Sequence, residues 1–125
     1  MDAREFFVLA QELMQGHREV DYRSAVSRAY YSAFHACRTL LKNIPNLPGS
    51  IGTSHQRVID ELLSHSDKQI NSLGNKLKVA RDLRQKADYQ LERAFSRYEA
   101  SRLLSQVQKI LSEVDDYLRS VKDNS

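Results

Sequence analysis

The sequence predicts an all-α fold, an antiparallel bundle of four or five helices in one domain. Apolar residues recur at spacings of three and four along most of the chain, and no segment shows the alternation of a half-buried strand. Both prolines and two of the four glycines fall within residues 45–52. A chain of 125 residues can bury a core without disulfides, so a single domain is expected over residues 1–125.

The first two helices are expected to form a hairpin. One helix is predicted over residues 3–14, with Gly16 as its stop. Asp21 is expected to cap a second helix that ends near Asn43, and residues 44–52 are expected to form a loop. The second helix has an apolar face at helical spacing, which we expect to face the core. Its members are Ala25, Val26, Ala29, Tyr30, Ala33, Phe34, Cys37, Leu40 and Leu41.

Two shorter helices are predicted next. Thr53 or Ser54 is expected to cap a third helix that ends near residues 64–68. A fourth helix is expected over residues 75–87, with Gly74 marking its start.

The fifth helix has the clearest start signal. Ser96 and Glu99 form the Ser-x-x-Glu pattern of a capping box. Apolar residues then follow at alternating spacings of four and three, which predicts a bundle or coiled-coil seam. They are Leu103, Val107, Ile110, Val114, Tyr117 and Val121. The sequence leaves open whether the flanking Leu104, Leu111 and Leu118 are core or pair with a second chain.

Charge is distributed unevenly along the chain. The net charge is +3, yet residues 68–109 hold ten basic and four acidic side chains. A basic excess attracts phosphates without sequence preference. The alternative interpretation is a set of solvated helix faces.

Several classes of protein are disfavoured by composition. The single cysteine, Cys37, falls on the apolar face of its helix, which favours a buried thiol in a reducing compartment. No signal sequence or apolar run of about 18 residues is present, so a cytoplasmic protein without membrane contact is expected. No metal site or cofactor is expected, because the histidines lack ligand spacing and the glycines form no phosphate loop.

Arg28 and His35 are the candidate catalytic pair. They are seven residues apart, and about 100° per residue places them on one helix face. Tyr31 and Ser32 lie between them on that face and are expected to contact a ligand. Cleavage of RNA without a metal needs a base, an acid and a cation at the phosphate. Histidine exchanges protons near neutral pH, and the planar arginine fork can clamp a phosphate.

A structural interpretation of the same residues stands beside the catalytic one. Asp88 can accept hydrogen bonds from Arg28 or His35, and Tyr89 can complete a buried network with it. His55 follows a predicted cap at a helix start, where a phosphate binds favourably, and the alternative is a surface histidine.

Three short motifs resemble one known family. They are Ser27-Arg28-Ala29-Tyr30-Tyr31 with Phe34-His35-Ala36, then Ser54-His55, then Leu83-Arg84 with Ala87-Asp88-Tyr89. In this order and spacing the chain resembles the prokaryotic branch of the HEPN domain, a helical family named for nucleotide binding in higher eukaryotes and prokaryotes. The resemblance covers roughly residues 1–120.

The resemblance implies a protein of a prokaryotic toxin–antitoxin or defence-type system that acts on or binds RNA or nucleotides. It implies a metal-independent endoribonuclease in which Arg28 and His35 are catalytic and Tyr31, Ser32, His55 and Arg84 contact the ligand. Catalytic members are homodimers, so two such helices would meet across a twofold axis. The alternative is a noncatalytic module that binds a nucleotide or a minimal nucleotidyltransferase partner.

The chain departs from the pattern of the family's ribonucleases in one respect. Those members usually carry Arg-x(4–6)-His late in the bundle, often with a polar residue after the arginine. Here the fitting pair lies in the second helix, Ala29 follows Arg28, and Arg84 has no histidine within reach along its helix. Nucleotide binding or packing is therefore kept as the alternative role of the pair.

Overall fold

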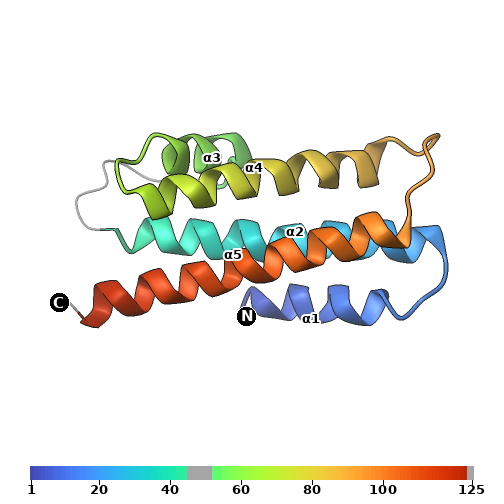
Figure 1. Ribbon diagram of the computed structural model, residues 1–125, viewed down its shortest axis with the longest axis horizontal. Helices are drawn as coiled ribbons and strands as arrows, with labels where there is room; N and C mark the ends of the chain where they lie inside the picture. The colour runs from blue at the N-terminus through green and yellow to red at the C-terminus, as the bar shows by residue number, and fades with distance from the viewer. Residues whose placement is uncertain (45–51, 124–125) are drawn as a thin grey trace.

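The computed structural model describes residues 1–44 and 52–123, which form a bundle of five α-helices without strands (Figure 1). The helices are α1 (Arg4–Leu13), α2 (Glu19–Lys42), α3 (His55–Leu63), α4 (Lys68–Tyr89) and α5 (Arg97–Asp123). The predicted all-α fold is confirmed. Most of the loop predicted over residues 44–52 lies outside the described residues.

The helix α2 is the centre of the bundle and contacts each of the other four helices. In Figure 1, α5 crosses in front of α2, with α3 and α4 above and α1 below. The apolar face predicted for the second helix is buried in full, from Ala25 to Leu41. Burial of apolar surface on this scale is the main stabilising contribution to such a bundle.

The predicted caps of α3 and α5 are confirmed. The Oγ of Ser54 accepts a hydrogen bond from the Arg57 amide at 3.3 Å. At the start of α5, the Ser96 Oγ accepts from the Glu99 amide at 3.1 Å, and the Glu99 carboxylate accepts from the Ser96 amide at 3.0 Å. Both arrangements satisfy amides that have no partner within the helix.

The predicted start of α2 at Asp21 is wrong. The helix begins at Glu19, and Asp21 caps it from the third position by accepting from the Arg18 amide at 3.1 Å. A Cβ atom at Gly16 would lie 2.2 Å from the Asp21 carboxylate oxygen. Gly16 is therefore needed for the close approach of the chain to this cap, besides following the end of α1.

The predicted start of α4 is also wrong, because the helix begins at Lys68 and Gly74 lies inside it. Asp67 caps the helix by accepting from the amides of Gln69 at 2.8 Å and Ile70 at 3.2 Å. Gly74 is where α3 packs against α4, since an added Cβ would lie 2.9 Å from the Leu62 Cβ. The glycine marks a close contact between helices and not a boundary.

The seam of α5 is buried from Leu103 to Val114, and its last members Tyr117 and Val121 are half-buried. Leu104 and Leu111, whose role the sequence left open, are buried in the core of this chain. The whole apolar stripe up to Val114 is therefore used within one copy.

Arg23 connects α2 to the end of α4, and no sequence pattern indicates this role. Its buried guanidinium donates to the backbone carbonyls of Lys86 at 3.3 Å, Ala87 at 2.9 Å and Gln90 at 3.1 Å, and to that of Arg93. Carbonyls at a helix end have no partner within the helix, so Arg23 satisfies them from a neighbouring helix.

Candidate functional site

The three motifs lie on three helices and meet at one place. At the centre is Tyr30 of α2, which is fully buried. Its ring stacks on the ring of His55, at the start of α3, with centroids 5.5 Å apart, and its hydroxyl lies 2.7 Å from His55 Nδ1. The guanidinium of Arg84, from α4, lies over the same ring at 5.0 Å. The fold thus brings together residues that are 25 and 54 positions away from Tyr30.

The two imidazoles share one layer of aromatic rings. Phe34 stacks on His55 with centroids 3.9 Å apart and meets His35 edge-on at 5.2 Å. Tyr31 lies 6.5 Å from His35 and 6.4 Å from His55. His35 and His55 are therefore close neighbours within one chain.

Arg28 and His35 face the same side of α2, as the spacing predicts, and α1 adds a residue to this side. The ring of Phe6 lies 5.9 Å from the Arg28 guanidinium, 5.9 Å from the His35 ring and 6.0 Å from the Tyr31 ring. Arg28 also lies over Tyr31 at 4.8 Å. Only the packing of α1 on α2 shows that Phe6 belongs here.

Five of the predicted site residues therefore form one cluster, which we call the motif surface. Its members are Arg28, Tyr31, His35, His55 and Arg84.

Two other predicted site residues lie apart from it. Ser32 is fully buried, because it falls on the side of α2 that carries the buried Ala25 and Ala36. It is not accessible to a ligand. Tyr89 is 72% exposed at the last position of α4, so the expected buried network with Tyr89 is wrong.

Asp88 lies beside the motif surface but with partners other than those expected. Its Oδ2 accepts from the Arg84 guanidinium and from the Ser27 hydroxyl, each at 3.4 Å. It forms no hydrogen bond with Arg28 or His35. Among the described residues, Arg28 and His35 have ring contacts but neither an ion pair nor a hydrogen bond from their side chains.

Burial, together with positive surroundings, favours the neutral form of both imidazoles. Burial lowers the pKa of His55, and the nearby Arg84, Arg81 and His35 lower it further. Burial and then Arg38 lower the pKa of His35. An anion placed between these groups would oppose both effects, because it stabilises the protonated imidazole.

The guanidinium groups on α4 retain unused donors. The Nε atoms of Arg81 and Arg84 are buried and have no hydrogen-bond partner among the described residues. Arg81 otherwise donates to the Gln56 side chain at 2.8 Å. Buried donors of this kind are rare and call for a partner. The motif surface can therefore attract a phosphate through the positive charge of these guanidinium groups.

The comparison with known families agrees with this geometry. The family model described as the HEPN domain matches residues 2–117. The chain belongs to the HEPN domain family. A search of curated proteins returned no match to it.

In this HEPN domain the match runs from before α1 to within α5, so the motif surface is inside the family region. Across residues 1–44 and 52–123, no three His, Cys, Asp or Glu side chains are grouped so that they could hold a metal ion. None of the helices described for this HEPN domain is long and apolar enough to span a membrane.

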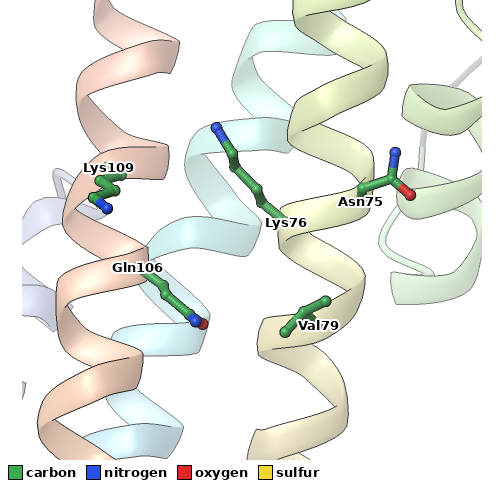
Figure 2. A pocket seen from close by; sticks show the side chains of 5 residues that line it. All are labelled: Asn75, Lys76, Val79, Gln106 and Lys109. Atoms are coloured by element: carbon green, nitrogen blue, oxygen red, sulfur yellow. The ribbon is translucent and has the colours of Figure 1, made fainter.

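Five cavities described for the HEPN domain are lined by residues outside the motif surface. One of about 310 Å³ is lined by residues of α4 and α5, with Val79 and Gln106 on opposite sides (Figure 2). The five residues of the motif surface are each half-buried, and together they present a basic and aromatic face, which suits an extended ligand better than an enclosed small molecule.

Proposed function

We propose that this HEPN protein binds RNA through phosphates at the motif surface. The observation that carries the proposal is the meeting of Arg28, Arg84, His35 and His55 from three helices around the two adjacent rings of Tyr30 and Tyr31. Guanidinium groups bind phosphate oxygens with paired hydrogen bonds. The half-buried ring of Tyr31 beside them can contact an unpaired base.

The availability of Arg28 supports this proposal. It lies over two aromatic rings and has no acidic partner among the described residues. An arginine held in place without a carboxylate is ready to bind an external anion, since the cost of displacing an internal partner is absent. The positive charges of Arg81 and Arg84, which act on the neighbouring His55, add to the attraction for an anion.

Binding is tested by fluorescence anisotropy of a labelled single-stranded RNA, with chelator present. We expect Arg28→Ala to weaken binding by about 1.5 kcal/mol or more, roughly tenfold, because a charged hydrogen bond is lost. The slope of log affinity against log salt concentration should also become shallower by about one, because one phosphate contact is lost. Arg119→Ala, at an exposed position on α5, is the matched control. Equal losses in both variants would contradict binding at the motif surface.

We also propose that the bound RNA is cleaved without a metal. The supporting observation is the pair of imidazoles in one aromatic layer. The lowered pKa of His35 favours the neutral form that a base needs, and a bound phosphate would favour the protonated form of His55 that an acid needs. His35 would remove the 2′-hydroxyl proton, and His55, held at Nδ1 by Tyr30, would protonate the leaving oxygen. One chain then supplies both proton-transfer groups, and Arg28 offsets the charge that develops on the phosphate.

Cleavage is tested with purified protein and structured RNA in chelator. We expect the parent and His17→Gln to produce ends with a 2′,3′-cyclic phosphate and His35→Gln to lose cleavage while keeping its fold. His17 is an exposed histidine outside the motif surface and controls for nonspecific effects. Cleavage by His35→Gln at the parent rate would contradict the proposed role of His35.

The cellular role that we propose is that of a homodimeric, cytoplasmic component of a toxin–antitoxin or defence-type system. The family supports this placement, and so does the basic motif surface. The alternative is a noncatalytic module that works with a minimal nucleotidyltransferase. Binding of ATP or GTP in calorimetry, with no RNA cleavage, would favour that alternative.

A further inference from the structure

A second surface of the protein lies between α4 and α5. Two adjoining cavities of about 310 and 400 Å³ share Val79 and Gln106, so they form one groove along the two helices. Figure 2 shows the first of them, with Lys76 and Val79 on α4 and Gln106 and Lys109 on α5. We call this the α4–α5 groove.

The α4–α5 groove and the motif surface occupy opposite sides of α4. Val79, Leu83 and Lys86 line the groove at helical spacing. Arg84 and Asp88 follow Val79 by five and nine residues, which is about 140° and 180° around the helix. A molecule bound in the groove would therefore leave the motif surface free.

The groove combines apolar and basic character. Val79 is 55% exposed and Tyr98 is 73% exposed, and both line it. Lys86, Arg102 and Lys109 also line it, and none of them forms an ion pair with a described residue. An exposed apolar strip between unpaired cations is typical of a surface that binds a partner.

The acidic residues at the groove do not neutralise these cations. The Glu99 carboxylate is used by Arg93 and by the capping box with Ser96. Glu113 pairs with Lys76, which also borders the groove. Asp82 remains as the acid without an ion pair among the residues described there. The groove therefore favours a partner with acidic residues around an apolar centre.

The outer face of α1 has that composition. Glu5, Val8, Leu9 and Glu12 follow one another at positions i, i+3, i+4 and i+7, so they share one face of the helix. Val8 is 52% exposed and Leu9 is 41% exposed, and an exposed glutamate stands at each end. We call these four residues the α1 stripe.

We propose that the α1 stripe of one copy of this protein docks in the α4–α5 groove of a second copy. Val8 and Leu9 would cover Val79 and Tyr98, while Glu5 and Glu12 would approach Arg102 and Lys109. Four of the large apolar side chains exposed in the described chain become buried in this way. Helix-in-groove recognition with acidic and basic flanks uses the same spacing of anchors.

Reciprocal docking gives a closed dimer. In Figure 1, α5 lies between α4 and α1, so α1, which carries the stripe, lies across α5 from α4. A twofold axis can then satisfy both contacts at once, each copy giving its stripe and receiving the other. A one-way contact without a twofold axis would instead build open chains of copies.

The test uses two charge-reversed variants and their mixture in sedimentation equilibrium. One is the groove variant Arg102→Glu/Lys109→Glu, and the other is the stripe variant Glu5→Lys/Glu12→Lys. We expect each variant alone to dimerise roughly tenfold or more weakly than the parent, because like charges then face each other. We expect an equimolar mixture to restore dimers, since a heterodimer has complementary charges at both contacts.

Lys42→Glu/Arg57→Glu is the matched control, because it reverses two exposed charges outside the groove. It should dimerise like the parent, and circular dichroism should show that every variant is folded. A monomeric parent, a mixture no better than the separate variants, or variants that dimerise like the parent would each overturn the proposal. The dimerisation experiment is separate from the test of RNA binding, which is measured on Arg28→Ala.

Discussion

The guanidinium of Arg23 joins the start of α2 to the end of α4 and also lies over the Phe95 ring at 5.3 Å. Glu19 holds it from the other side at 3.4 Å and accepts from the Phe95 amide at 2.6 Å. One planar group thus fixes the connection between α4 and α5. Its position in turn determines how α5 begins beside α2.

Replacing Arg23 with alanine should therefore destabilise the fold strongly. Several backbone carbonyls would lose their donor, at a cost of about 2–4 kcal/mol and a fall of roughly 10 °C in Tm. Arg23→Lys should recover little of this, because an ammonium group cannot reach several carbonyls in one plane. Thermal denaturation with Arg119→Ala as control measures the effect. A Tm for Arg23→Ala within a degree of the parent would contradict the role.

The histidines of the motif surface link stability to pH. The pKa values of His35 and His55 are lowered in the folded protein, so the unfolded chain binds more protons below its own histidine pKa of about 6.5. Stability is therefore fully present above that pKa and falls as the pH decreases through it toward the folded values.

We expect Tm to decrease between pH 7.5 and 5.5, and to decrease less in His55→Gln, which cannot titrate. The range stays above the usual pKa values of carboxylates, so their protonation contributes little. Arg119→Ala, an exposed substitution that removes no imidazole, should keep the slope of the parent. A steeper decrease in His55→Gln than in the parent would show that the sign of this linkage is wrong.

Among the helices, α2 agrees most closely with its sequence pattern and α4 least closely, and the reason lies in where their residues point. The inward face of α2 is almost continuous, so its spacing alone identified the core. The first turns of α4 carry few apolar residues, with Ile70 and Leu73 the buried ones there. Because the apolar pattern of these turns is weak, the sequence predicts Gly74 as the start of the helix. In the structure Gly74 lies within α4 and packs against α3.

The contacts missed by sequence reasoning are those between residues far apart in the chain. Arg23 bonds to carbonyls 63 to 70 residues away, and no local pattern indicates such a pairing. Phe6 joins Arg28 and His35 only through the packing of α1 on α2. Arg28, His35, His55 and Arg84 are predicted as site residues because the motifs that carry them resemble one family. That they lie together is seen only in the structure.

The contact between α3 and α4 gives a prediction about helix packing. Gly74→Ala would gain up to about 1 kcal/mol in helix propensity if the site were open. Here the new Cβ would lie 2.9 Å from the Leu62 Cβ and 3.0 Å from the Leu63 amide nitrogen. The backbone cannot yield as a side chain can, so a net loss of roughly 1–3 kcal/mol is expected.

Urea denaturation measures this loss, and Asn75→Ala at the next, exposed position is the control for propensity alone. A Gly74→Ala protein more stable than the parent would show that α3 does not pack as closely as the structure has it. Because His55 begins α3, a shift of α3 should also weaken RNA binding at the motif surface.

The two surfaces of the bundle should act independently, because they lie on opposite sides of α4. At physiological ionic strength the screening length is about 8 Å, so charges on one surface have little effect at the other. We expect the groove variant Arg102→Glu/Lys109→Glu to lose dimerisation and to keep the affinity of each copy for a short RNA. Arg28→Ala should do the reverse.

Both quantities can be measured on the same preparations, by sedimentation for the dimer and by anisotropy for RNA at 0.15 M salt. If RNA affinity fell equally in the groove variant and in Arg28→Ala, the two surfaces would be one binding site that extends around α4. If Arg28→Ala abolished the dimer, the twofold contact would instead run through the motif surface, with Arg28 and His35 of two copies facing each other. Separate losses would show that this small bundle uses one side of α4 for RNA and the other for its own second copy.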